Sequence, residues 1–333
     1  VFEYVESDED GDRLVKNADP NVQIYTGYDQ LDLLQKLLIR VNKNWSTELN
    51  LQLSTSSNIP RFDRLTRYDG DTLEYSQWDY GPQNRVFVAS TTEWTGESKL
   101  VDKAKIIAAA QNIQEQRLTR RFGNVNKLDQ TERVTVFSLN LDLVKDLDAN
   151  AALFYGAEIT TNDVQSEDYE EDITNGQRVP STTRYPDGGS RLSSAGLYLN
   201  YRKELSGKVG LDLGGRLSQV ATSSKFEDTS LVKLPFSEVE INNAAATFSV
   251  AMRYRPTNNW NFDLVLSSGF RSPNVDDYGK VFEKDGYIVI PNDEIKPEFA
   301  YNAELGLTRT ARNGRTELYG AVFYTPVSYT HLT

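Results

Sequence analysis

The feature that most constrains this chain is a two-residue alternation of apolar and polar side chains, repeated along most of its length. In the segment STELNLQLSTS, Leu49, Leu51 and Leu53 alternate with polar residues. The same pattern returns in VFSLNLDLVKDL, AGLYLNYRKEL and NFDLVLSSGF, where Leu139 and Leu264 hold apolar positions. Successive side chains of a β-strand point to opposite faces, so a slip of one residue would exchange the two faces. The pattern therefore predicts an all-β chain whose strands have a well-specified register.

The connections between these segments alternate between short turns and long polar loops. Short turns are expected at 41–45, 95–100, 145–150, 203–208, 254–259 and 310–315. Long polar segments lie at about 6–27, 58–83, 166–190, 223–243 and 271–297. Short turns on one side and long loops on the other are typical of an outer-membrane barrel. We therefore predict a transmembrane antiparallel up-and-down β-barrel with short periplasmic turns and long extracellular loops.

The composition fits a barrel with a wet interior, and it also leaves a soluble all-β protein open. Hydrophobic residues make up 38% of the 333 residues and aromatic residues 11%, with 18 tyrosines. No stretch approaches the roughly 18 consecutive apolar residues of a transmembrane helix, which excludes a helical membrane protein. The formal net charge of −12 argues against nucleic acid as a partner, because nucleic acid requires basic patches.

Three tryptophans lie beside expected short turns: Trp45, Trp94 and Trp260. Each one alone could equally pack in an ordinary core. Together, on one side of the expected sheet, they favour the aromatic girdle that membrane barrels place at the membrane interface.

One segment, 103–122, is rich in helix-forming residues and could form an amphipathic helix. We assign it as a strand, because the up-and-down order of its neighbours requires one there. This choice brings the count to about thirteen strands, each of roughly the length that a tilted membrane-spanning strand needs.

Two motifs resemble the β-barrel of TonB-dependent outer-membrane receptors. They are FRSPNVDDYGKVFE at 270–283 and IPNDEIKPEFAYNAELGL at 290–307. In that family an F-R-[AS]-P-N segment leaves one strand and an N-P-x-L-K-P-E segment enters the next. SNIPRFDRLTRY, QWDYGPQNR and YGAEIT, which begin at residues 57, 77 and 155, are similar to the family as well. The matching positions, for which the resemblance implies a structural role, are Phe270, Arg271, Pro273, Asn274, Asn292, Lys296, Pro297 and Glu298. The chain departs from the family mildly at Asp293 and Ile295, where Pro and Leu are usual.

The resemblance implies that residues 1–325 form a partial barrel, with about thirteen of the roughly 22 strands of a plugged transporter. The plug domain and TonB-box of the family are not visible in the sequence. The closing string PVSYTHLT, which holds the single histidine His331, resembles translated sequencing-adaptor sequence. We therefore expect 326–333 to be a non-native tail.

The resemblance also implies a function and a location. Receptors of this family capture a scarce, bulky solute with their outer loops, and TonB then moves the plug with energy from the inner-membrane proton gradient. The expected location is the outer membrane of a Gram-negative bacterium, in contact with its lipid and lipopolysaccharide. The expected ligand is a ferric siderophore or another iron complex. A haem/haemoglobin receptor, a passive porin-like barrel and a soluble carbohydrate-binding β protein remain as alternatives.

The loop at 58–83 supplies most of the candidate ligand-binding residues. It combines arginines with aromatic rings, which suits an anionic, conjugated ligand such as a ferric siderophore. The candidates are Arg61, Arg64, Arg67, Tyr68, Trp78 and Tyr80. A structural alternative is that the arginines pair with Asp63 and Asp69.

Two further candidates lie in the long loop at 271–297. Tyr278 and Tyr287 could ligate ferric haem, since Tyr is an axial ligand elsewhere. Haem receptors of the family typically carry a His between the two motifs, and 274–291 contains none. This absence places haem below a siderophore as the expected ligand.

The residues do not indicate an enzyme. The chain has no cysteine, one histidine and no G-x-S-x-G segment, so the usual nucleophile–base sets are absent. Asp276 and Asp277 could serve a glycosidase but are more readily interpreted as a solvated pair. The acidic run ESDEDGDRL at 6–14 could bind Ca²⁺ through residues 6–12, although it lacks the spacing of an EF-hand loop. No other metal or cofactor is expected.

Overall fold

A computed structural model describes residues 1–8, 11–227, 236–279, 282–284, 287–289, 292, 295–311 and 314–328 of the chain. The long strands are β3 (Gln30–Arg40), β4 (Trp45–Ser56), β9 (Asn84–Thr95), β10 (Lys103–Arg121), β11 (Asn126–Asp148), β12 (Ala151–Asp172), β14 (Ser190–Ser206), β15 (Val209–Lys225), β16 (Glu238–Thr257), β17 (Trp260–Arg271), β20 (Glu298–Thr310) and β21 (Glu317–Tyr324). The shorter elements are β1 (Glu3–Asp8), β2 (Gly11–Lys16), β5 (Ile59–Pro60), α1 (Phe62–Leu65), β6 (Tyr68–Asp69), β7 (Thr72–Leu73), β8 (Tyr75–Tyr80), β13 (Arg178–Pro180), α2 (Val275–Tyr278), β18 (Phe282–Lys284), β19 (Tyr287–Val289) and β22 (Val327–Ser328).

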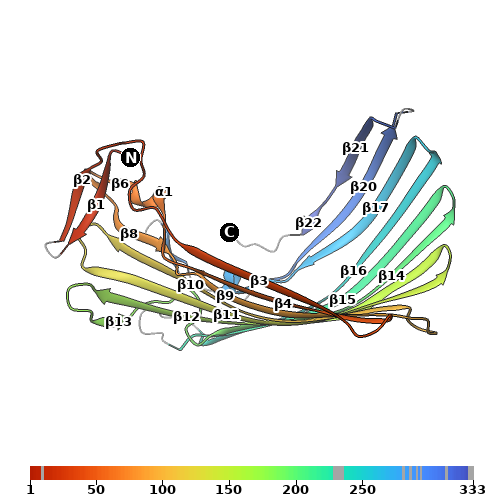
Figure 1. Ribbon diagram of the computed structural model, residues 1–333, viewed down its shortest axis with the longest axis horizontal. Coiled ribbons are helices and arrows are strands. Elements are labelled where there is room, and N and C mark those ends of the chain that lie inside the picture. Colours follow the sequence, from red (N-terminus) through yellow and green to blue (C-terminus); the bar gives the residue numbers. More distant parts are fainter. Residues whose placement is uncertain are drawn as a thin grey trace.

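The long strands form one antiparallel sheet in the order β21-β20-β17-β16-β15-β14-β12-β11-β10-β9-β4-β3. Each long strand pairs with its neighbour along the chain, which is up-and-down topology. Figure 1 shows a curved sheet that is not closed on itself, as expected of a partial barrel. The predicted all-β antiparallel barrel fold is confirmed, with twelve strands in the described order where about thirteen were expected.

The segment with helical composition is strand β10, as the neighbouring strands required. It pairs with β11 from Lys103 to Thr119 without a register shift. The tertiary ladder therefore overrides the helix propensity of its Ala, Gln and Glu residues.

The two faces of the sheet differ in the way that the alternation predicts. Leu139 pairs with Ile159 and Leu197 pairs with Leu217, and all four side chains are exposed. On the opposite face Arg216 bonds to Glu158, and the Tyr198 hydroxyl donates to Asp142. The exposed apolar face suits lipid, and the opposite face, lined by paired polar groups, suits a wet lumen.

The three tryptophans all lie at the short-turn end of their strands. Trp45 and Trp94 are cross-strand partners, with ring centroids 6.3 Å apart. Trp260 stacks on Phe262 with centroids 6.2 Å apart. Their common level agrees with an aromatic girdle.

Several expected loops contain more strand than the alternation suggested. Part of 6–27 forms the β1–β2 hairpin, and 58–83 contains β5, α1, β6, β7 and β8. β12 and β15 also continue into the loops expected at 166–190 and 223–243. Beyond the membrane neither face needs to be apolar, so backbone pairing continues while the alternation that signals it disappears.

Among the residues that the structure describes, no helix is both long enough and apolar enough to cross a membrane. At the end of the chain, Val327–Ser328 forms β22 beside β20. The residues after 328 lie outside the described part, so the origin of the expected tail at 326–333 stays a prediction.

Candidate functional site

The candidate aromatic residues of the 58–83 loop lie on the lumen face of the sheet. β8 continues the sheet beyond β9 and pairs with β10, so that Tyr80 lies opposite Arg117. The uninterrupted β10–β11 ladder places Arg117 on the same face as Asp142, which belongs to the polar lumen side. Trp78 is two residues from Tyr80 on the same strand and shares that face.

Four side chains form what we call the arginine–aromatic cluster: Arg61, Trp78, Tyr80 and Arg117. The Arg61 guanidinium carbon lies 4.8 Å from the Trp78 ring centroid and 5.3 Å from that of Tyr80. Arg61 Nη1 donates a hydrogen bond of 2.9 Å to the Tyr80 hydroxyl. Arg117 lies over the same Tyr80 ring, 5.5 Å from its centroid. The cluster thus presents two cations held on aromatic rings, the arrangement of a cation–π site.

The other candidates of this loop have partners within the loop and its surroundings. Arg67 pairs with Glu74 at 3.0 Å, and the Tyr68 hydroxyl donates to Glu3 at 2.8 Å. Asp63 accepts a bond of 2.8 Å from Arg61 Nε and lies 3.9 Å from Arg64 Nε. The expected alternative, in which arginines of the loop pair with an aspartate, is therefore observed at Asp63. Asp69 instead lies near Arg121, with 3.9 Å between Asp69 Oδ2 and Arg121 Nη1.

The F-R-S-P-N segment connects three elements. Arg271 Nη2 donates to both carboxylate oxygens of Asp277, at 2.7 and 2.8 Å, and Arg271 Nη1 lies 3.4 Å from Glu298. Asn274 caps helix α2 by accepting bonds from the backbone nitrogens of Asp276 and Asp277. These contacts fix the end of β17 to α2 and to the start of β20.

The remaining motif positions lie around this junction. Phe270 packs against Phe299, with ring centroids 5.3 Å apart, and Pro273 is buried. The backbone nitrogen of Asn292 donates to the Tyr278 carbonyl at 3.0 Å. Lys296 and Pro297 lead into β20, with Lys296 exposed. Asp293 lies outside the described residues.

The two candidate haem-ligating tyrosines have different surroundings. Tyr278 is only 1% exposed, and its hydroxyl lies 2.7 Å from Ser224 Oγ. It packs in a small core with Phe226, Val239 and Ile241. Tyr278 thus holds α2 against the lumen face of β15 and β16. Tyr287 belongs to strand β19, and its side chain lies outside the described part.

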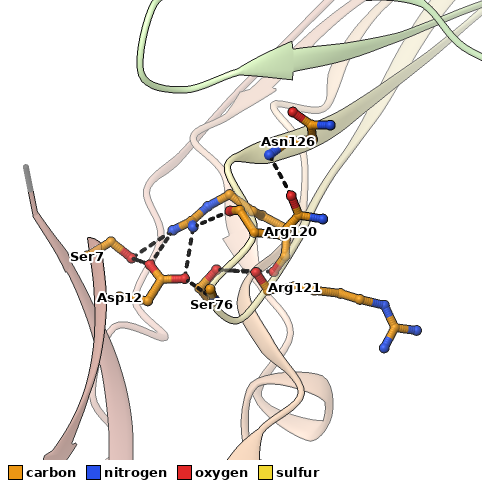
Figure 2. Close-up of polar contacts among 8 residues, drawn as sticks. Ser7, Asp12, Ser76, Arg120, Arg121 and Asn126 are labelled. Atoms are coloured by element: carbon orange, nitrogen blue, oxygen red, sulfur yellow. Dashed lines mark hydrogen bonds and ion pairs between the residues drawn. The ribbon is translucent and has the colours of Figure 1, made fainter. Parts of the chain in front are cut away.

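The acidic run near the N-terminus forms a hairpin that is clamped to β10 through a buried ion pair (Figure 2). Arg120 donates to Asp12 at 2.8 and 2.7 Å, and both side chains are almost fully buried. Asp12 also accepts bonds from Ser7 Oγ and from the backbone nitrogen of Gly123. Burial opposes ionisation, yet these hydrogen bonds outweigh it and hold the pKa of Asp12 below its usual range.

These contacts occupy part of the expected calcium site. Besides the Asp12–Arg120 pair, Glu6 accepts a bond of 2.7 Å from Arg13. No group of three or more acidic or histidine side chains with metal-binding geometry occurs among the described residues. Glu9 and Asp10 lie outside them, so calcium binding at 6–12 stays a prediction.

A hollow of about 520 Å³ lies between the hairpin and β8. Its walls include Tyr4, Tyr25, Gln77 and Asp79. Asp79 precedes Tyr80 on one strand, so the two side chains point to opposite faces. The hollow is therefore separate from the arginine–aromatic cluster.

A second group of lumen-facing residues, which the sequence reasoning missed, continues from the cluster. Arg117 pairs across the sheet with Gln130, and Gln130 pairs with Asp168. Gln130 Nε2 donates to Asp168 Oδ2 at 2.6 Å. Next to this row, Glu132 lies opposite Ser166. A signal was present for β11, because Gln130 and Glu132 lie an even number of positions from Asn140, a polar position of the alternating segment VFSLNLDLVKDL.

Burial controls the ionisation of this second group. A membrane-spanning strand needs about 9–11 residues, so Asp168, 17 residues beyond the start of β12 at Ala151, lies outside the spanning part. Burial raises the pKa of Asp168 to about 7, with the charges of Glu132 and Asp129 adding to the effect and Gln130 opposing it. Burial also raises the pKa of Glu132.

Comparisons with known proteins agree with this architecture. A family model described as TonB dependent receptor-like, beta-barrel matches residues 8–328. No curated protein matches the chain.

Solved structures match in fold at low identity. The copper transporter OprC has a TM-score of 0.72 and 11% identity, over 90% of this chain and 45% of that chain. The siderophore receptor PiuA from Acinetobacter baumannii has a TM-score of 0.63 and 14% identity. The match covers 89% of this chain and 49% of the PiuA chain. The Serratia marcescens hemophore receptor HasR, in complex with its hemophore HasA and heme, has a TM-score of 0.65 and 13% identity. The match covers 90% of this chain and 45% of the receptor chain.

The chain spans less than half the length of each of these receptors, and at such identities the likeness concerns the fold alone. The family match, however, covers nearly the whole chain and includes both motifs from which the resemblance was inferred. The expected family is confirmed: the chain belongs to the TonB-dependent receptors, β-barrel transporters of the outer membrane of Gram-negative bacteria, and represents part of their barrel.

Proposed function

We propose that this chain is the barrel part of a receptor that takes up a scarce, bulky solute across the outer membrane, and that the solute is a ferric siderophore or another iron complex. The observation that carries the proposal is the arginine–aromatic cluster on the lumen face, beyond the membrane-spanning part of the sheet. Siderophore, hemophore and copper proteins among the structures of similar fold agree with a metal-related cargo.

The cluster suits an anionic, conjugated ligand for two reasons. Guanidinium groups form bidentate bonds with carboxylate-like oxygens, and they remain charged at all physiological pH values. Arg61 already forms an ion pair with Asp63, whereas Arg117 makes no ion pair with any described residue. Arg117 is therefore the cation more available to a ligand, and Trp78 supplies an aromatic face beside it.

The proposal includes the partners of the family. Uptake would depend on the TonB complex, acting through the plug domain that receptors of this family carry. The exposed apolar face of the sheet would contact outer-membrane lipid, and the long outer strands would contact lipopolysaccharide. Membership of the family makes a passive porin or a soluble carbohydrate-binding protein less suitable as an explanation.

Uptake of radiolabelled iron tests the proposal in iron-starved cells that express the full-length protein as their only receptor of this family. A panel of anionic ferric siderophores serves as the probe. Arg117→Ala should lower uptake about tenfold or more, because a charged hydrogen bond is worth about 1.5–3 kcal/mol. Arg61→Ala should lower it less.

Arg133→Ala is the matched control. Arg133 lies on the neighbouring strand but on the opposite face, where it pairs with Glu167 at 3.0 Å. Its loss should leave uptake unchanged. Equal uptake by the Arg117 and Arg133 variants, at equal amounts of protein in the membrane, would refute the assignment of the cluster as ligand site.

A further inference from the structure

Among the buried oxygen atoms on the lumen face that have no hydrogen-bond partner, three belong to neighbouring residues of β11 and β12. They are Asp168 Oδ1, Glu132 Oε1 and Ser166 Oγ. The three residues are 3%, 7% and 4% exposed, respectively. Buried polar groups are almost always satisfied, so three orphan acceptors in one place require an explanation.

The strand register makes these three residues neighbours. Glu132 lies directly opposite Ser166, and Asp168 is the next residue on the same face of β12. Asp168 is thus the diagonal neighbour of Glu132, at a Cβ separation of about 7–8 Å. The charge of Glu132 acts on Asp168, which agrees with this proximity.

The site is electrically incomplete. Glu132 and Asp168 form no ion pair with any described residue. The charge of Arg117 acts on both carboxyl groups, but its guanidinium lies over the Tyr80 ring and forms no ion pair with either. Two buried carboxyl groups without an ion-pair partner are costly, and a bound cation would reduce that cost.

We propose that Asp168, Glu132 and Ser166 bind a primary ammonium group carried by the ligand. An –NH₃⁺ group has three donors and no acceptor, and the site offers three unpartnered oxygens. This inference rests on the proposed function, since the same lumen wall would hold the anionic part of the ligand at Arg61 and Arg117. The receptor would then select zwitterionic iron complexes, with an amine next to the anionic, metal-bound groups.

A hard metal ion fits the same atoms less well. Ca²⁺ takes 6–8 oxygen ligands, and the wall supplies two carboxylates and a hydroxyl. No metal-binding group of three acidic or histidine side chains was found in the described part of the chain. An ammonium group needs only the three acceptors that are present.

The segment from 181 to 189 follows β13 and lies beside the site. The Ser181 backbone nitrogen donates to the Asp168 carbonyl at 2.9 Å, and the Tyr185 hydroxyl donates to Asp276 at 2.6 Å. Glu132 and Arg117 both act electrostatically on Tyr185, so its ring lies near the boundary between the acidic site and the cluster. A ligand amine would enter beside Tyr185.

Binding of n-butylammonium to the purified full-length protein tests the proposal. At about pH 8 the amine is still protonated and Asp168 is ionised. The thermal midpoint should rise with butylammonium concentration, whereas tetramethylammonium, which has no N–H donor, should have no such effect. Asp168→Asn should weaken the apparent affinity about tenfold, the value of one charged hydrogen bond.

Glu167→Gln is the matched control, because Glu167 precedes Asp168 on the strand and faces the opposite side. Its response to butylammonium should equal that of the wild type. Ser166→Ala removes one acceptor without changing the charge, so it should weaken binding even if the Asp168 variant fails to fold. No response in the wild type, or an equal response in all variants, would overturn the proposal. The assay contains no iron, so this inference can fail while the uptake experiment succeeds, and the reverse.

Discussion

The inner and outer halves of the same strands are stabilised in different ways. Near the short turns, β11 and β12 expose Leu139 and Ile159 on one face and hold polar pairs on the other. Further out, the same two strands carry buried carboxyl groups at Glu132 and Asp168. The inner half is specified by the lipid around it, and the outer half by individual polar contacts. The same ladder of backbone hydrogen bonds thus continues from the part of the strands that faces lipid into the part beyond it.

The largest effect is expected from a charge placed on the lipid face of the inner half. Leu139→Arg should destabilise the barrel by about 2–4 kcal/mol if the residue lies near the bilayer midplane. Asn140→Arg, on the lumen face one residue away, should cost far less. Denaturant unfolding of the full-length protein in lipid vesicles measures both. Equal costs would contradict the assignment of the two faces.

A smaller and local effect is expected in the outer half, at the hairpin clamp. Asp12→Ala leaves the Arg120 guanidinium buried without its partner, which should cost about 2 kcal/mol. The cost is limited because the β1–β2 hairpin can open and admit water to Arg120. Hydrogen exchange should therefore increase in the hairpin and remain unchanged in β11.

Glu6→Ala provides the comparison for the clamp. Glu6 pairs with Arg13 in the same hairpin, at an exposed site, so its loss should change little. Increased exchange throughout the sheet after Asp12→Ala would instead show that the hairpin supports the whole barrel.

A further effect is a pH dependence of stability that belongs to the outer half alone. Burial raises the pKa of Asp168 to about 7, above its ordinary value, so the folded state binds a proton more tightly than the unfolded state. The resulting stability is complete below about pH 4 and is lost as the pH rises towards 7. Each unit of pKa difference corresponds to about 1.4 kcal/mol, so the loss over a rise of about three units should reach about 4 kcal/mol.

Thermal unfolding between about pH 4 and 8 measures this dependence. Asp168→Asn should flatten it, whereas Glu167→Gln should not. An unchanged slope in the Asp168 variant would show that this carboxyl group does not titrate in the expected range.

The arginine–aromatic cluster shows how far the sequence could predict the site. Arg61, Trp78 and Tyr80 were chosen for their chemistry, and the structure brings them together with short contacts. Arg117 was missed, because it lies 37 residues beyond Tyr80 within a segment of helical composition. Only the β8–β10 pairing shows that it belongs to the same surface.

The sequence by itself determined the all-β class, the two faces and the inner-half register, because lipid and water on opposite sides of a strand impose a period of two on the residues. It also determined the family, through short motifs such as F-R-S-P-N. The tertiary structure alone decided the outer half: the clamp of Asp12 on Arg120, the burial of Tyr278, and the grouping of Asp168, Glu132 and Ser166. Those contacts join residues that are far apart in the chain, and once lipid no longer covers one face, no periodic pattern records which of them will meet.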